Sequence, residues 1–332
     1  MPIRLIFKAS NLSAPLHKTL LYRAMLYRLA LVALAVSVLL PVAVAQKNAA
    51  DQDDTVKLHA DLVVLTVTVT DPAGQYAHGL KDKDFAILED GSPQTVHSFF
   101  AEEAPFAAAI LMDMSGSMEG KFGLVRAAAA SFIDQIRADD QVAVYGFNNK
   151  VRLYQEFTNV RDISEYVWEA EAEGNTRLYD CMSDAIDALV KREEKRRAIL
   201  LISDGWDSSS QKATLDSVMK KALGAGVVVY TLDLTDKDIL QGNSQQVLLL
   251  RRGRKEMQEF ASQTGGRYIH SPQGDKLEEG FVQIVDELRN QYTLTYYPTN
   301  QKRDGRWRKL SVAVGRQGLS TRSRRGYYAP KD

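Results

Sequence analysis

The residues of this chain whose types and spacing could do chemistry are concentrated in residues 113–117, which read Asp-Met-Ser-Gly-Ser. The segment directly follows Phe106–Met112, an apolar stretch that is typical of a buried strand. Ligands of open α/β sheets bind at the carboxyl ends of the strands. The sequence therefore predicts that Asp113, Ser115 and Ser117 present one carboxylate and two hydroxyls at a ligand-binding edge.

Two further oxygen-bearing side chains occur where they could complete the same site. Thr176 lies in a Gly-Asn-Thr segment that leads into a predicted helix, and Asp204 follows the apolar strand Ala198–Ser203 in a Ser-Asp-Gly segment. Hard divalent cations prefer oxygen ligands, and Mg²⁺ takes about six of them at roughly 2.0–2.1 Å. Because three separate loops each supply oxygens, the sequence predicts a Mg²⁺ site, with Mn²⁺ or Ca²⁺ as alternatives.

The chemistry of this oxygen set favours binding over catalysis. Neutral hydroxyls outnumber carboxylates, so a divalent cation would stay partly unneutralised and an open coordination position would attract an acidic group of a partner. Catalytic metal sites usually add a base such as His or Glu, whereas His97 and His270 lie outside these loops. We therefore expect no enzymatic activity. The Asp-x-Ser-x-Ser segment alone would also fit a helix N-cap, a position that Asp and Ser favour.

Strand and helix patterns alternate from Phe106 onward. The predicted strands are Phe106–Met112, Gln141–Phe147, Val151–Gln155, Ala198–Ser203, Val227–Leu232 and Arg267–His270. The predicted helices are Lys121–Ile136, Asp162–Trp168, Leu178–Lys191, Leu215–Leu223, Lys255–Gln263 and Leu277–Arg289. This alternation predicts an α/β domain over residues 105–290 with a doubly wound, mostly parallel sheet. Residues 207–210, Asp-Ser-Ser-Ser, are expected to form a solvated loop.

Strand patterns without helices flank this domain on both sides. The predicted strands fall within Leu62–Thr70, Leu80–Leu88, Gln94–Phe100, Gln291–Tyr297, Lys309–Val314 and Leu319–Tyr328. Each flank alone has too few strands to be stable. We therefore expect residues 61–103 and 291–330 to pair into one small β-sandwich into which the α/β domain is inserted.

The N-terminal region has the features of an export signal. Leu29–Ala45 carries no charge, and it ends in the A-x-A cleavage pattern Ala43-Val44-Ala45. We predict a signal peptide over residues 1–45, a polar linker over residues 46–60, and a periplasmic, cell-surface or secreted protein. Met25 is an alternative start, and an uncleaved anchor, which would give the only membrane association, is the alternative to cleavage.

Charge and cysteine content restrict the partners. The 42 basic and 42 acidic residues cancel, which gives no reason to expect nucleic acid binding. Lys302–Arg325 nevertheless holds nine basic residues and one acidic residue. This stretch predicts either solvated hairpin faces or a contact surface for an anionic envelope polymer. Cys181, the only cysteine, lies on the apolar face of a predicted helix and is expected to be a buried thiol.

Phe106–Arg289 resembles a von Willebrand factor type A domain, the fold shared with integrin I domains, on the Asp-x-Ser-x-Ser, Thr and Ser-Asp-Gly segments described above. These segments match the metal-ion-dependent adhesion site (MIDAS) of that family. The resemblance implies Ser115 and Ser117 as direct metal ligands and Thr176 as a direct or water-bridged one. It implies that Asp113 and Asp204 act mainly through waters.

The flanks resemble those of the acidobacterial exported type of von Willebrand factor A-related protein. The matching segments are Asp84-Phe85-x4-Asp90-Gly91, Tyr292-x-Leu-x-Tyr-Tyr-Pro298 and Arg325-Gly326-Tyr327-Tyr328. The resemblance implies an exported adhesion module that grips an exposed carboxylate of a protein ligand through a divalent cation. The alternative is an envelope assembly or scaffold protein in which the metal is mainly structural.

Overall fold

The computed structural model describes residues 62–101, 104–236, 244–271 and 277–331. The predicted signal peptide and linker lie outside these residues. Within them, no helix is both long and apolar enough to cross a membrane. Cys181 is buried and free, as the sequence predicts.

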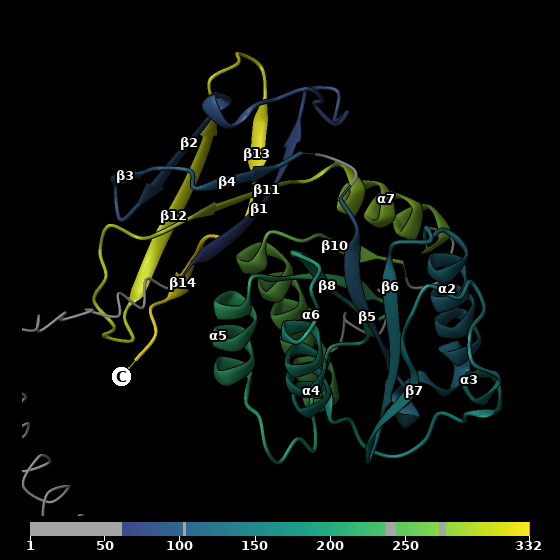
Figure 1. The fold of residues 1–332 in the computed structure, drawn as a ribbon. Coiled ribbons are helices and arrows are strands. Elements are labelled where there is room, and N and C mark those ends of the chain that lie inside the picture. Colours follow the sequence, from purple (N-terminus) through teal and green to yellow (C-terminus); the bar gives the residue numbers. More distant parts are fainter. Residues whose placement is uncertain (1–61, 102–103, 237–243, 272–276, 332) are drawn as a thin grey trace, which may run out of the picture. The chain divides into compact units, whose positions relative to one another are not determined.

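A six-stranded sheet forms the centre of the α/β domain, in the order β10-β9-β8-β5-β6-β7 (Figure 1). Its strands are β5 (Phe106–Asp113), β6 (Gln141–Phe147), β7 (Val151–Thr158), β8 (Arg196–Ser203), β9 (Val227–Asp233) and β10 (Tyr268–His270). All neighbours are parallel except β7, which runs antiparallel to β6 at one edge. The doubly wound, mostly parallel sheet expected from the sequence is therefore confirmed.

Helices cover both faces of this sheet. The helices are α2 (Phe122–Asp134), α3 (Glu165–Glu169), α4 (Leu178–Val190), α5 (Leu215–Ala225), α6 (Gln245–Thr264) and α7 (Leu277–Asn290). Apolar side chains of α2, α3 and α7 pack on one face of the sheet, and those of α4, α5 and α6 pack on the other. The strand β5 is buried along its whole length because its alternate side chains enter both layers.

The helix predicted to start at Lys255 starts ten residues earlier, at Gln245. Ser244 caps it by accepting a hydrogen bond from the backbone N–H of Val247 at 3.3 Å. The prediction was wrong because Gly253, with basic residues around it, resembles a helix break. In the structure Gly253 serves close packing instead, since a Cβ there would lie 2.6 Å from the backbone of Gly205.

Strands from both flanks of the chain form two four-stranded sheets, β13-β1-β11-β4 and β14-β12-β2-β3. The strands are β1 (Val63–Thr70), β2 (Phe85–Glu89), β3 (Ser92–Gln94), β4 (Ser98–Phe100), β11 (Tyr292–Tyr296), β12 (Trp307–Val314), β13 (Ser320–Arg322) and β14 (Gly326–Tyr328). β1 pairs with β11 and β2 pairs with β12, so each sheet joins the two flanks. One apolar core lies between the sheets, which confirms the predicted sandwich.

Two of the predicted strands are each divided between the sheets. Gln94–Phe100 and its neighbours form β3 in one sheet and β4 in the other, and Leu319–Tyr328 is likewise divided between β13 and β14. Alternation of apolar and polar residues shows which side chains are buried, but both sheets bury side chains against the same core. The pattern therefore could not show where the chain crosses from one sheet to the other.

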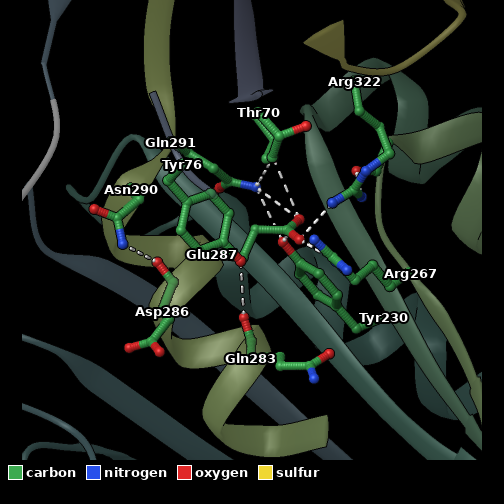
Figure 2. A network of polar contacts seen from close by, with 12 residues as sticks. Thr70, Tyr76, Tyr230, Arg267, Gln283, Asp286, Glu287, Asn290, Gln291 and Arg322 are labelled. Carbon is green, nitrogen blue, oxygen red and sulfur yellow. Dashed lines mark hydrogen bonds and ion pairs between the residues drawn. The ribbon is translucent and has the colours of Figure 1, made fainter. Parts of the chain in front are cut away.

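Two buried polar side chains join the sandwich to the α/β domain. Arg196, at the start of β8, donates hydrogen bonds to backbone carbonyls of both connections between the two parts, at residues 101, 104, 288, 289 and 291. Glu287, on α7, accepts a hydrogen bond from the hydroxyl of Tyr230 at 2.8 Å and forms ion pairs with Arg267 and Arg322 (Figure 2). Because Arg322 belongs to β13, this network ties α7 to the sandwich.

Two short 3₁₀ helices complete the described elements, Asp82–Asp84 before β2 and Gly116–Lys121 before α2. The second begins inside the Asp-x-Ser-x-Ser segment, directly after β5.

Candidate cation-binding site

The predicted site residues lie where the order of strands in the α/β sheet reverses. From β5 the chain continues to β6 and β7 on one side, and then returns to β8, β9 and β10 on the other. β5 and β8 are parallel neighbours, so Asp113 at the end of the first and Asp204 directly after the second lie at the same edge. Such a switch point leaves a crevice at the carboxyl ends of the strands, where open α/β sheets bind ligands.

The first loop of the site, residues 113–117, is held by hydrogen bonds among its own residues. Asp113 is fully buried, and its Oδ1 accepts hydrogen bonds from the backbone N–H of Ser115 at 2.9 Å and from its hydroxyl at 2.5 Å. The hydroxyls of Ser115 and Ser117 lie 3.1 Å apart. Ser115 occupies the N-cap position of the 3₁₀ helix, but its side chain makes no capping hydrogen bond. The helix-cap interpretation therefore does not account for this serine.

The second loop adds another carboxylate. The hydroxyl of Ser203 donates to Oδ2 of Asp113 at 2.5 Å, and it accepts a hydrogen bond from the backbone N–H of Gly205 at 2.8 Å. Asp204, which is 5% exposed, accepts hydrogen bonds from Ser117 and from the backbone N–H of Trp206. A serine hydroxyl of each loop therefore donates a hydrogen bond to the aspartate of the other loop.

The third loop approaches through its backbone. The N–H of Gly116 donates to the carbonyl of Gly174 at 3.0 Å. Thr176 is 4% exposed, and its N–H donates to the hydroxyl of Ser208 at 2.9 Å. Its carbonyl accepts from the N–H groups of Ser208 and Ser209, both at 3.0 Å. The structure thus brings the loops of all five predicted residues to one edge, although the contacts of Thr176 fix its backbone rather than its hydroxyl.

The residues around the site differ from the sequence-based expectation in two ways. Residues 207–210 are not simply a solvated loop, because they support Thr176 and the start of α4. Asp207 accepts from the N–H of Tyr179 at 3.3 Å, and Ser210 accepts from the N–H of Asp180 at 3.1 Å. Sequence reasoning also missed Ser203, which contacts Asp113. Its place directly before Asp204 at the end of a buried strand was the available signal.

Comparison with known families decides what this domain is. Residues 108–206 match the family model for the von Willebrand factor type A domain, a span that runs from β5 to the second loop of the site. This chain contains a von Willebrand factor type A domain. A domain of this family suggests a module of protein interaction or adhesion.

Two known proteins are similar to part of this chain. An uncharacterized protein of Synechocystis is 27% identical over 145 residues, which cover 41% of this chain and 34% of that protein. The inter-alpha-trypsin inhibitor heavy chain H2 of Mus musculus is 28% identical over 172 residues, which cover 45% of this chain and 18% of that protein. The match therefore spans about a third of the first relative and less than a fifth of the second.

Among solved structures, an aerotolerance-related membrane protein of Bacteroides fragilis is similar to 55% of this chain over 98% of its own length. Its sequence identity is 17% and its TM-score is 0.43.

The candidate site carries two buried carboxylates close together. Burial and the nearby Asp204 raise the pKa of Asp113 to about 7, and its hydrogen bonds from Ser115 and Ser203 only partly oppose this. Burial also raises the pKa of Asp204, against the opposing effects of the Ser117 hydroxyl and of Lys121. The ammonium of Lys121 forms its ion pair elsewhere, with Asp236 at 2.8 Å.

The donor set fits a hard cation. All of its side-chain donors are oxygens, which Mg²⁺ and Ca²⁺ prefer, and none is the nitrogen or sulfur typical of zinc sites. In the described part of the chain, no group of three or more His, Cys, Asp or Glu side chains could hold a metal ion. Any metal at this edge therefore depends on serine and threonine hydroxyls together with the two carboxylates.

Proposed function

We propose that the von Willebrand factor A domain of this protein binds a divalent cation at the switch point and grips an acidic group of a protein partner through it. One observation carries the proposal: two loops place two buried carboxylates and two serine hydroxyls at one edge, and Asp113, Ser115, Ser117 and Asp204 are linked by hydrogen bonds. A cation there would be coordinated by oxygens that now form hydrogen bonds with one another.

Burial across the site gives the cation an inner and an outer side. Asp113 and Ser115 are buried, whereas Gly116 and Ser117 are exposed. Ser115, Ser117 and Thr176 would offer hydroxyls to the cation, and Asp113 and Asp204 would supply negative charge behind them. The exposed side leaves room for a carboxylate of a partner, which would complete the neutralisation of a divalent charge.

We propose a binding role rather than an enzymatic one. Two side chains of the α/β domain that could act as a base already have polar partners. Asp236 pairs with Lys121. The imidazole of His270, which lies at the end of β10, contacts the guanidinium of Arg254 and the carbonyl of Thr235, each at 2.8 Å.

We also propose that the protein is exported to the periplasm, the cell surface or the medium. The support is the uncharged stretch Leu29–Ala45 with its A-x-A pattern. Cation-mediated adhesion outside the cytoplasm would not depend on disulfides, which a chain with a single cysteine cannot form internally.

The alternative is a scaffold role in which the cation mainly cross-links the three loops. The hydrogen bond between Gly116 and Gly174 favours it, because a bound cation would reinforce a contact that already joins two loops. The two roles differ in what the removal of metal does. A scaffold would lose stability only, whereas an adhesion module would also lose its partner.

Calorimetric titration of Mg²⁺ and Mn²⁺ into the metal-stripped protein tests the proposed site. We expect saturable binding that is lost in Asp113→Ala. Asp216→Ala, which removes an exposed carboxylate of α5, is the matched control and should bind like the parent. Absence of saturable binding to the parent, or equal binding by both variants, would contradict the proposal.

A further inference from the structure

A cavity of about 530 Å³ lies where α5 and α6 face the strands β12 and β14 of the sandwich. This volume is within the usual range for ligand pockets, which often lie between domains. Its apolar wall comes from two sources. Leu215, Met219 and Leu223 of α5 form one side, and the rings of Trp307 and Tyr328 form the other.

The two rings are held in place. Their centroids lie 5.0 Å apart in an edge-to-face arrangement, and a Cβ on Gly326 would lie 2.3 Å from the Trp307 ring. Glycine is therefore needed at 326 for the indole to lie against the strand. The ammonium of Lys220 lies 5.1 Å from the Tyr328 ring and pairs with Asp216 at 2.7 Å, so the charge of Asp216 is already paired.

Two cations from the sandwich border the cavity. Lys309 and Arg325 are exposed, and within the described residues neither side chain has an ion pair or a hydrogen bond. Five other basic residues of Lys302–Arg325 have partners within the fold: Arg306 and Arg308 with Asp304, Arg316 with Asp84, Arg322 with Glu287, and Arg324 with the carbonyls of Val64 and Leu223. The basic surface predicted from the sequence is therefore smaller than expected.

Hydrogen-bond acceptors lie on the helical side of the cavity. Glu259 and Gln263, one turn apart on α6, both line it. Their side chains bring carboxylate and amide oxygens to the same cavity, and the backbone carbonyl of Gln263 accepts a hydrogen bond from the backbone N–H of Arg325 at 3.0 Å. A suitable ligand therefore combines an anionic group, an apolar body and N–H donors.

We propose that this cavity binds the carboxyl-terminal end of a peptide whose last side chain is apolar. The terminal carboxylate pairs with Lys309 and Arg325, since hydrogen bonds between charged groups are the strong ones. The last side chain packs between Trp307 and the apolar face of α5. The peptide N–H groups donate to Glu259 and Gln263. A simple fatty acid has no N–H donors and would leave these two acceptors without a partner. Capture of a terminal carboxylate is a recurrent mode of peptide recognition.

This site is independent of the proposed cation site. The sandwich joins the α/β domain where β5 begins, at Phe106, and the cation site lies where β5 ends, at Asp113. None of the residues that line the cavity belongs to the proposed cation site. The protein would therefore have two separate contacts for partners.

Binding of acetyl-Gly-Gly-Leu with a free carboxylate, followed by calorimetry and by the fluorescence of Trp307, tests the proposal on the full chain. We expect at least tenfold tighter binding than that of the same peptide with a carboxamide end, because the amide loses the charge. Trp307→Phe should remove the fluorescence change and keep the binding. Equal affinity of the two peptides, or no binding of either, would overturn the proposal.

Variants locate the binding within the cavity. We expect Lys309→Met and Arg325→Met each to weaken the free-acid peptide about tenfold and to leave the carboxamide peptide unchanged. Lys302→Met, a charge change in the same basic stretch but outside the cavity, is the matched control and should bind normally. A similar loss in Lys302→Met would show general charge attraction and refute the assignment.

Two further measurements test whether the occupant is a fatty acid and whether the two proposed sites are independent. Decanoate tests a fatty acid as the occupant, and binding of decanoate as tight as that of the peptide would contradict the assignment of a peptide end. Asp113→Ala should bind the peptide normally, so a failure of the cation proposal leaves this one standing. Loss of peptide binding in that variant would contradict the independence of the two sites.

Discussion

Two buried carboxylates of the α/β domain, Asp113 at the end of β5 and Glu287 on α7, have very different surroundings. Both are fully buried. Burial alone would raise the pKa of Glu287, but Arg322 and Arg267 more than offset it and hold that pKa below its ordinary value. Burial raises the pKa of Asp113, and the nearby Asp204 raises it further. Within the described residues, two guanidinium groups pair with Glu287, whereas Asp113 accepts hydrogen bonds from serine groups, and we propose that a cation from solution binds there.

The largest expected effect comes from breaking the structural cluster. Glu287→Ala leaves Arg267 and Arg322 without their shared partner at the junction of the two parts, and we expect it to lower the free energy of unfolding by about 3–5 kcal/mol. Urea denaturation measures this. Asp113→Asn, which removes charge from the other buried carboxylate, should leave the metal-free protein as stable as the parent or slightly more so. A comparable loss in both variants would remove the distinction between the two clusters.

A smaller effect is expected when the cation is supplied. A ligand that binds only the native state stabilises it by about 2.7 kcal/mol at a hundredfold excess over its Kd. Mg²⁺ should therefore raise the Tm of the parent and of Glu287→Ala. It should leave the Tm of Asp113→Asn unchanged. Thermal unfolding with and without Mg²⁺ makes the comparison, and an equal shift in Asp113→Asn would place the bound cation elsewhere.

The smallest effect is a dependence of stability on pH. Because the pKa of Glu287 is lower in the folded chain than in the unfolded one, its contribution is present above the ordinary Glu pKa of about 4.3 and is lost as the pH falls through the folded value. Glu287→Gln should therefore lose less stability than the parent over that acidic range. Urea midpoints at several pH values below 5 test this, and parallel curves would show that Glu287 does not titrate with unfolding.

The sequence was most informative about features set by local patterns. The apolar run before Asp113 predicted β5, and its Asp-x-Ser-x-Ser segment therefore had to lie at a carboxyl end. The strand order then brings Asp204 beside it. The flanking strands also paired as expected, because neither flank has enough strands to form a sheet pair alone.

Features set by contacts between distant segments were not accessible in this way. Gly253 interrupts a helical pattern, yet it lies within α6 because that helix packs against Gly205. Ser203 resembles any polar residue at a strand end until β8 is placed beside β5. Arg324, between β13 and β14, is buried and donates hydrogen bonds to the carbonyls of Val64 and Leu223. Such partners far apart in sequence leave no periodic signal.

The most direct test of the cation account is a crystal structure grown with Mn²⁺ and measured near the manganese absorption edge. We expect an anomalous peak at the carboxyl ends of β5 and β8, within coordination distance of the hydroxyls of Ser115 and Ser117. We also expect an open position toward solvent or a carboxylate of a neighbouring molecule. Well-ordered loops with no peak between Asp113 and Asp204 at saturating Mn²⁺, or a peak only elsewhere, would contradict the account.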